Sequence, residues 1–319
     1  MTRNPDVVVL RQNIHGMAPE RYVEALEDRF PDREVAYAGT PTAERELLPG
    51  ASVVAGLDVD EELLDRAENL RLFACSYAGV DHLPLDALRE RGVAVTNAAG
   101  VHAPNVSEYA LGAVLTFARD FLESRRRQRR REWRSHQAHE LAGSTVAVVG
   151  MGAIGQSIVE RLDAFDAHTV GVRYTPEKGG PTDEVYGYDE LCEAVGDAAY
   201  VLLACPLTDA TRHLVDEEAF VTMPPDSVLV NVARGGVVDT DALVGALRGN
   251  SIRGAALDVT DPEPLPEDHP LWTFENVLIT PHNAGHTPEY FQRLADIVAD
   301  AVRAAEDSGE WSGLPNQVV

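Results

Sequence analysis

The chain has 319 residues, too many for one small core, and 45% of them are hydrophobic, as in a globular protein. Its longest apolar runs are too short to cross a membrane, and Met1–Arg11 lacks the apolar core of a signal peptide. With 52 Asp and Glu against 27 Lys and Arg, the formal charge of −25 argues against nucleic acid as a main partner. We therefore expect a cytoplasmic protein of about two domains, with no membrane or nucleic-acid partner.

The first hundred residues alternate strand and helix patterns. Strands are expected at Val7–Leu10, Glu34–Ala38, Ser52–Ala55, Leu72–Cys75 and Ala94–Thr96, and helices between them include Pro19–Phe30 and Glu61–Ala67. This alternation predicts a parallel sheet with crossover helices. A longer helix is expected at Asn105–Phe121, where apolar residues from Val106 to Phe117 recur at helical spacing.

A run of arginines, Arg125–Arg134, follows that helix. Such a run can mark a nucleic-acid patch, but in so acidic a chain we favour pairing with carboxylates, within the chain or across a subunit contact. His136 and His139 form H-x-x-H without a third ligand at metal spacing, so no metal site is expected. Cys75, Cys192 and Cys205 likewise show no disulfide or zinc pattern.

A second alternating series begins at Thr145. Strands are expected at Thr145–Val149, Thr169–Val172, Tyr200–Ala204, Val228–Asn231, Ala255–Leu257 and Val277–Ile279, and helices at Ile154–Ala164, Tyr188–Val195, Glu217–Val221 and Thr240–Arg248. A last helix at about Pro288–Glu306 could rejoin the first series. The predicted fold class is therefore α/β with two parallel sheets.

Residues 145–162 read TVAVVGMGAIGQSIVERL, a strand that runs through a glycine motif into a helix. This is G-x-G-x-x-G in the context that a dinucleotide site requires. Gly150 permits the tight turn, Gly152 lets a pyrophosphate approach the backbone, and Gly155 lets helix and strand pack closely. Ala153 and Ile154 open the helix, whose N–H groups would face the phosphates.

The next strand should end in the residue that meets the adenosine ribose. Enzymes that use NAD place an acid about 20 residues after the motif, whereas an arginine accommodates the 2′-phosphate of NADP. Here the strand ends in Arg173, followed by Tyr174 and Thr175. We therefore expect NADP(H) to be preferred, while NAD(H) can still be used; an exposed arginine without a ligand is the alternative.

Further motifs resemble the D-isomer-specific 2-hydroxyacid dehydrogenase family. They are VNVARGGVV at 230–238, ALDVTDPEP at 256–264 and TPHNAGHT at 280–287, together with segments 73–100 and 105–115. The resemblance implies two Rossmann-like or flavodoxin-like domains with a cleft between them. Residues 1–100 and 287–319 would form a discontinuous substrate-binding domain, and 101–286 the dinucleotide-binding domain.

The resemblance also implies that Arg234, Glu263 and His282 are the catalytic residues. Reduction of a 2-oxo acid needs a hydride from nicotinamide and a proton for the carbonyl oxygen, and an imidazole such as that of His282 can supply the proton near neutral pH. Glu263 would favour the protonated ring and fix its orientation. Arg234 presents a planar fork that suits a substrate carboxylate.

Other contacts follow from matched positions. The loop Ser76–Val80 would hold the substrate carboxylate, with Tyr77, Ala78 and Gly79 in contact with substrate. The further cofactor contacts implied are Val106, Cys205, Pro206, Thr211, Val232, Ala233, Asp258, His282 and Gly285. His102 and Ala103 lie near the expected cleft, but we interpret them as a surface loop.

The reaction class leaves several alternatives. A glyoxylate or hydroxypyruvate reductase differs only in substrate size, and a dinucleotide-sensing corepressor would use the same fold for binding rather than catalysis. A phosphoglycerate dehydrogenase with a regulatory domain is not expected, since the chain leaves no room for one after Val319. The resemblance and the arginine-rich segment Phe121–Leu141, with Trp133, favour a homodimer.

The excess of Asp and Glu over Lys and Arg suggests the salt concentration in which the protein works. The carboxylates are spread along the chain, and Lys178 is its only lysine. Such a charge repels itself at low ionic strength, but salt at about 1 M shortens the screening length to about 3 Å. We therefore expect a halophilic protein; an ordinary acidic protein is the alternative.

Overall fold

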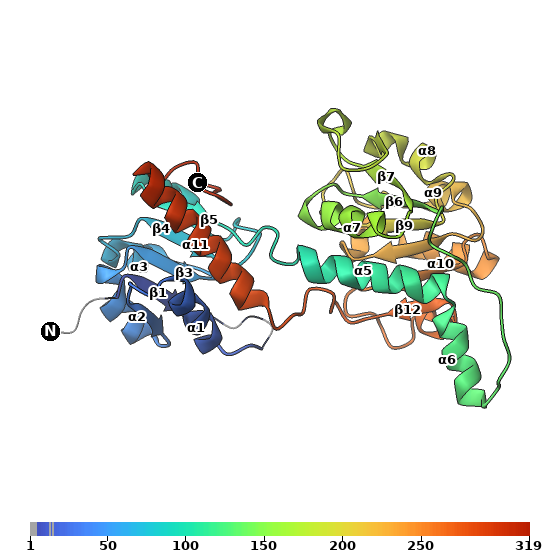
Figure 1. Ribbon diagram of the computed structural model, residues 1–319, viewed down its shortest axis with the longest axis horizontal. Coiled ribbons are helices and arrows are strands. Elements are labelled where there is room, and N and C mark those ends of the chain that lie inside the picture. The colour runs from blue at the N-terminus through green and yellow to red at the C-terminus, as the bar shows by residue number, and fades with distance from the viewer. Residues whose placement is uncertain (1–4, 13, 15) are drawn as a thin grey trace. The chain divides into compact units, whose positions relative to one another are not determined.

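The computed structural model describes residues 5–12, 14 and 16–319, and the chain forms two compact units (Figure 1). The first unit takes the described residues up to Val101 together with His286–Val319, and the second takes His102–Gly285. These bounds lie one residue from the expected ones. Residues 1–4, part of the stretch that we examined for a signal peptide, lie outside the described residues.

The first unit is built on a five-stranded parallel sheet in the order β2-β1-β3-β4-β5. Its strands are β1 Val7–Leu10, β2 Val35–Ala38, β3 Val53–Gly56, β4 Leu72–Cys75 and β5 Ala94–Thr96. One face is covered by α1 Glu20–Arg29 and α11 Tyr290–Ser308, the other by α2 Pro41–Leu47, the turn η1 Leu48–Gly50, α3 Glu61–Arg66 and α4 Leu85–Glu90. The rings of Tyr22 in α1 and Phe291 in α11 stack at 5.1 Å between centroids. A helix near the C-terminus therefore packs against one near the N-terminus.

The second unit holds a seven-stranded parallel sheet in the order β12-β11-β10-β9-β6-β7-β8. The strands are β6 Thr145–Val149, β7 His168–Val172, β8 Glu184–Tyr186, β9 Tyr200–Leu203, β10 Val228–Asn231, β11 Gly254–Leu257 and β12 Val277–Ile279. One face packs against α5 Ala103–Ala118 and α7 Ala153–Asp163, the other against α8 Leu191–Val195, α9 Glu217–Thr222 and α10 Thr240–Gly249. Short turns η2 to η5 occupy Pro176–Lys178, Tyr188–Glu190, Gly235–Val237 and Pro270–Thr273.

The predicted α/β class with two parallel sheets is confirmed, and the differences are local. The sequence patterns gave no bounds for the short helices α2 and α4, and they missed the short strand β8 and α6 Phe121–Arg130, whose residues are all at least partly exposed. The surface-loop interpretation of His102 and Ala103 is wrong. Ala103 is buried and begins α5, because Pro104 in the first turn has the backbone angle that starts a helix.

In the part of the chain that the structure describes, we find no helix with the length and apolar character that spanning a membrane requires. The cytoplasmic location stays a prediction.

Candidate active site

The strands of the second unit place its loops at one edge of the sheet. The strand order reverses beside β6, which pairs with β7 on one side and β9 on the other. In parallel sheets, ligands bind at the carboxyl ends of the strands where the order reverses. Gly150 directly follows β6 with φ +104, and a Cβ there would lie 2.5 Å from the backbone nitrogen of Cys205 after β9. Glycine therefore lets the two loops meet.

The glycine motif has the shape that a pyrophosphate needs. A Cβ on Gly155 would clash with the carbonyl oxygen of Gly150, so this glycine lets α7 begin directly above the turn. Gly152 instead faces open space, with no atom within 4 Å of a Cβ built there. Ala153 is exposed and Ile154 half-buried in the first turn of α7. The open backbone and the free N–H groups of this helix fit a dinucleotide phosphate.

The segment after β7 carries the residues expected at the adenosine end. The Arg173 guanidinium donates to the carbonyl oxygen of Gly179, within its own loop. Tyr174 is 77% exposed, and its ring is tilted against that of Tyr188, 6.3 Å between centroids. Thr175 precedes η2. The arginine fork is thus partly engaged, with its other N–H groups left for a ligand.

Several residues expected to touch the cofactor have buried side chains. Cys205 is 3% exposed, and burial raises the pKa of its thiol to about 11. The hydroxyl of buried Thr211 donates to the carbonyl oxygen of Pro206 at 2.6 Å and so shapes its own loop. Val106 packs in the core beneath α5. At these positions only the backbone, or exposed Pro206, is available to a ligand.

The loop after β10 is held by Asn231, which the sequence analysis missed. This buried amide accepts from the backbone nitrogen of Ala233 at 3.0 Å and donates to the carbonyl of Arg234 at 3.1 Å. Val232 and Ala233 are buried, whereas Arg234 is exposed and donates to the Ala233 carbonyl at 2.6 Å. A Cβ on Gly235 would overlap the Thr260 backbone. The arginine loop therefore packs directly against the loop that leads to Glu263.

Asp258 is the centre of the third loop. Its carboxylate is 3% exposed and accepts from the Thr280 hydroxyl at 2.6 Å and from the backbone nitrogens of Asn283 and Ala284 at 2.8 and 2.9 Å. Its carbonyl accepts from the His282 nitrogen at 2.8 Å. The family resemblance implies that Asp258 contacts the cofactor. In this structure three of its acceptor positions hold the turn Thr280–Ala284.

The turn presents His282 to Glu263. His282 has φ +52, a left-handed conformation that its neighbours must enforce in a residue other than glycine. Its Nδ1 lies 2.7 Å from Oε1 of Glu263, and the two side chains are 48% and 42% exposed. Gly285 follows, with a Cβ position 3.5 Å from the His102 ring. His282, Glu263 and the arginine loop thus lie at the same edge of the sheet as the glycine motif.

The comparisons with known proteins identify the family. Residues 111–284 match the model of the D-isomer specific 2-hydroxyacid dehydrogenase NAD binding domain. A glyoxylate reductase of Thermofilum pendens is 37% identical over 76% of this chain and 73% of its own length. The chain belongs to the D-isomer-specific 2-hydroxyacid dehydrogenase family.

Two other relatives of this dehydrogenase family extend the comparison. A D-3-phosphoglycerate dehydrogenase of Methanocaldococcus jannaschii is 35% identical over 79% of this chain, which spans only 48% of that protein's length. The crystal structure of a family member from Xanthobacter autotrophicus Py2, in complex with NADPH and MES, superposes with a TM-score of 0.77 at 27% identity and covers 99% of this chain and 98% of that one.

The first unit contains the loop that the family resemblance assigns to the substrate. Ser76 anchors it: its hydroxyl donates to Gln12 at 2.9 Å, and its carbonyl accepts from the Tyr290 hydroxyl at 2.7 Å. Beyond it, Tyr77 is 45% exposed, and Ala78 and Gly79 are exposed. The backbone N–H groups of residues 78–80 make no hydrogen bond among the described residues. They are therefore available to a carboxylate.

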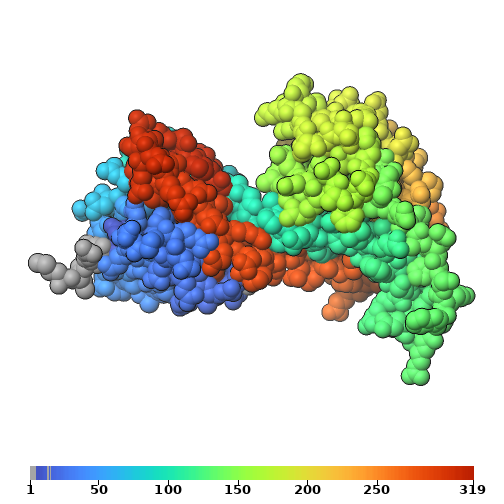
Figure 2. Space-filling view, viewed as in Figure 1, coloured from blue at the N-terminus to red at the C-terminus, as the bar shows by residue number. Residues whose placement is uncertain are grey.

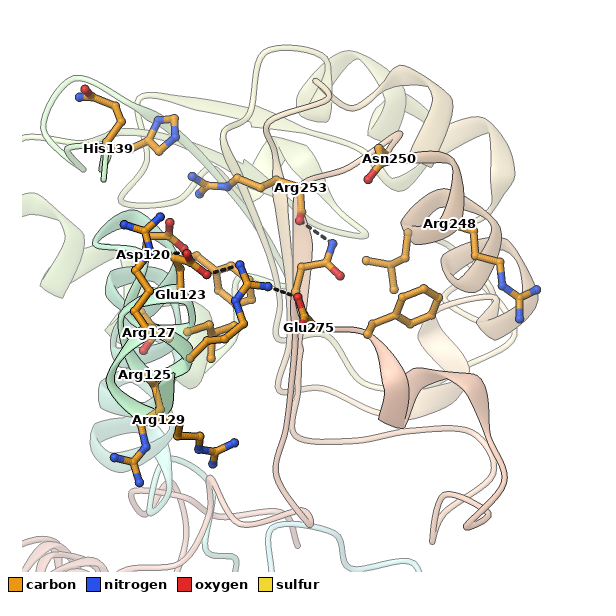
Figure 3. A pocket seen from close by; sticks show the side chains of 18 residues that line it. Asp120, Glu123, Arg125, Arg127, Arg129, His139, Arg248, Asn250, Arg253 and Glu275 are labelled. Atoms are coloured by element: carbon orange, nitrogen blue, oxygen red, sulfur yellow. Dashed lines mark hydrogen bonds and ion pairs between the residues drawn. The ribbon is translucent and has the colours of Figure 1, made fainter. Parts of the chain in front are cut away.

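The arginine run forms part of a separate cavity of about 1060 Å³ beside α6 (Figure 3). Arg126 pairs with Glu123 and Glu275, and Arg127 also pairs with Glu123, whose pKa these arginines lower, Arg127 most. The predicted pairing within the chain thus holds for these two arginines. Arg253 and Asn276 line the cavity just before β11 and β12, so it lies at the sheet edge opposite to His282.

His136 and His139 lie on the segment that follows α6. Within the described residues, no group of three or more His, Cys, Asp or Glu side chains is placed to hold a metal ion.

Proposed function

We propose that the protein is an NAD(P)H-dependent dehydrogenase that interconverts 2-oxo acids and D-2-hydroxy acids. The observation that carries the proposal is the pairing of His282 with Glu263 at 2.7 Å, on the same sheet edge as Arg234 and the glycine motif. A histidine oriented by a carboxylate can transfer a proton to a carbonyl oxygen, and the glycine motif would bind the dinucleotide that supplies the hydride. The family to which the chain belongs supports the same reaction class.

In the proposed reaction, His282 supplies the proton. Since Glu263 occupies Nδ1, Nε2 is the ring atom left to face the substrate oxygen. A nicotinamide bound at the glycine motif would supply the hydride. Each reduction consumes one hydride and one proton, and the reverse reaction returns the proton to Nε2. Glu263 holds the ring in place and stabilises its positive charge while the proton is held there.

Arg234 and the Ser76–Val80 loop would bind the substrate. The arginine fork can pair with the substrate carboxylate, since its bond to the Ala233 carbonyl uses only one of its N–H donors. The resemblance assigns the N–H groups of residues 78–80 to a substrate carboxylate, and the exposed Tyr77 ring to the substrate side chain. The proposal covers small 2-oxo acids in general. A reductase that acts on glyoxylate or hydroxypyruvate is the alternative, and it differs only in the size of the substrate.

We propose further that NADP(H) is preferred and that NAD(H) is also used. Arg173 stands where an acid would select NAD, and its remaining N–H groups can meet a 2′-phosphate beside Tyr174 and Thr175. The relative from Xanthobacter autotrophicus was crystallised with NADPH, which is consistent with this choice.

The assay that tests the proposed function follows NADPH and NADH oxidation with a panel of 2-oxo acids, in high and in low salt. We expect turnover of at least one small 2-oxo acid, with the faster rate or lower KM for NADPH. No oxidation of either cofactor with any acid of the panel, by protein that still binds NADPH, would contradict the proposed dehydrogenase and favour a dinucleotide-sensing binding protein.

We propose that the acidic surface is an adaptation to salt. Glu44 and Asp258 are the only buried acids among the described residues, which include all 52 Asp and Glu. So many surface carboxylates repel one another when screening is weak. The melting temperature should therefore be lower at 0.1 M than at 2 M salt; equal melting temperatures in NaCl and KCl at both concentrations would contradict the adaptation.

We propose a homodimer joined through the second unit. Helix α6 and the segment after it project from the rest of this unit (Figure 2). On them Trp133 is fully exposed and Phe121 is 55% exposed, and such aromatic side chains are typical of interfaces. Light scattering in molar salt should show a dimer, and Trp133→Ala should weaken it. A wild-type monomer at assay concentration would refute the dimer.

A further inference from the structure

The turn that carries His282 is held from two sides, and only one of them belongs to the sheet. From the sheet side, Asp258 accepts from Thr280, Asn283 and Ala284. From the other side, α5 reaches the same turn. The amide of Asn105 donates to the carbonyl oxygen of Ala284 at 2.7 Å, and the hydroxyl of Tyr109 lies 2.6 Å from that of Thr280.

Asn105 and Tyr109 form a pair with a regular geometry. They lie four residues apart in α5, so their side chains stand one above the other on the same face of the helix. Their partners, Thr280 and Ala284, are the first and last residues of the turn. The helix therefore contacts the turn at both of its ends, with His282 between them.

The direction of the Tyr109 bond can be assigned. A carboxylate can only accept, so the single hydroxyl hydrogen of Thr280 goes to Asp258 at 2.6 Å. Tyr109 must then donate to Thr280. Burial raises the pKa of Tyr109, which keeps its hydroxyl protonated. Tyr109, Thr280 and Asp258 thus form a chain of donors that ends on the carboxylate.

Helix α5 is also fixed to the element that follows the glycine motif. It packs along α7, where the hydroxyls of Ser107 and Ser157 are 3.2 Å apart. α7 begins at Ala153, directly after Gly152. One rigid helix therefore contacts both the helix at the phosphate loop and the turn of the proton donor.

We propose that Asn105 and Tyr109 are positioning residues, which set the place of His282 relative to the glycine motif through their bonds to the two ends of its turn. This proposal rests on the proposed function of His282. Both residues would act through the turn, to which their side chains bond. The left-handed φ of His282 is a strained conformation, and bonds at both ends of its turn help to hold it.

The test compares Tyr109→Phe in the wild type and in His282→Ala, with kcat at saturating 2-oxo acid and KM for NADPH as readouts. Loss of one hydrogen bond should lower kcat about fivefold in the wild type, with KM for NADPH changed less than about twofold. In His282→Ala, Tyr109→Phe should have almost no further effect, because the group that it positions is gone. Thr116→Val is the matched control, since it removes a hydroxyl of the same helix that bonds only within the helix.

The outcomes separate the two proposals. Wild-type kcat in His282→Ala would refute the proposed function itself. If His282→Ala is slow, then unchanged kcat in Tyr109→Phe, or an equal fivefold loss in both backgrounds, would overturn the positioning role. Should Tyr109→Phe fail to fold, Thr280→Ser and Thr280→Val replace it: serine keeps the hydroxyl and should keep the activity, whereas valine should lose it. Equal activity of these two variants would also overturn the proposal.

Discussion

Two parts of the same sheet edge differ in how their side chains are held. After β10, β11 and β12, Asn231 and Asp258 are 1% and 3% exposed, and their hydrogen bonds fix the loops of Arg234 and His282. After β7, Tyr174 is 77% exposed, and the side chain of Arg173 bonds to one carbonyl of its own loop. Buried side chains therefore hold the loops proposed for the chemistry, whereas the loop proposed to select the cofactor is held by the half-buried Arg173 and carries an exposed ring. Substitutions should therefore lower the activity most in the loops after β10, β11 and β12.

The largest effect is expected at His282. His282→Ala should lower the rate of 2-oxo acid reduction by about 10²- to 10⁴-fold, because the positioned proton donor is lost, while NADPH affinity changes little. Stopped-flow reduction and a fluorescence titration of NADPH measure the two. His213→Ala is a matched control, since His213 is an exposed histidine that also has a left-handed φ of +51. A variant within threefold of wild-type rate would remove His282 from this role.

A smaller loss is expected at Arg234. Arg234→Lys should lower kcat/KM for a small 2-oxo acid by about tenfold or more, since an ammonium cannot reproduce the two parallel N–H bonds of the fork. Arg212→Lys, an exposed arginine between β9 and α9, serves as the control. Unchanged kinetics in Arg234→Lys would show that the fork does not bind the carboxylate.

The smallest of the three effects is expected at Arg173. Arg173→Asp should reverse the order of NADPH and NADH, through a change of about five- to tenfold in their apparent affinities, since exposed ion pairs contribute little in water. The same change of charge in Arg248→Asp, at the other sheet edge, should leave the ratio of the two cofactors as it is. If the wild type prefers NADH, or if the ratio is insensitive to Arg173→Asp, the exposed-arginine alternative is correct.

The elements of the chain also differ in how well the sequence predicts them. Strands β1, β4, β5, β6, β10 and β12 have the predicted bounds, because buried parallel strands read as short runs of β-branched and apolar residues. Strand β8 is the outermost strand of its sheet, and its short sequence EVY contains no such run, so it was missed. Helix α6 was missed because its arginines leave no apolar face.

The candidate site shows a similar limit. The family resemblance pointed to Glu263 and His282, which lie 2.7 Å apart in the structure. It could not identify Asn231, Thr280 or Tyr109, whose partners are known only once the strands pair. Tyr109 in particular reads as one more apolar position at helical spacing, since its hydroxyl finds Thr280 171 residues further along the chain. The bond of Arg173 to Gly179 was likewise invisible, because a loop carbonyl has no signature in the sequence.

The bond between Asn105 and Ala284 also bears on how the chain can be built from two folding units. These residues lie within four residues of the ends of the second unit, His102 and Gly285, so those ends are tied together. Because the two ends of the inserted second unit adjoin, the first unit needs to bridge only a short gap between its own two segments. The entropy lost in closing this gap then hardly depends on how many residues the inserted unit contains. The host holds its own exit point in a similar way, with Arg293 donating to the carbonyl of Val101 at 3.0 Å. A chain of this design can lengthen or replace its inserted unit without disturbing the sheet into which it is inserted.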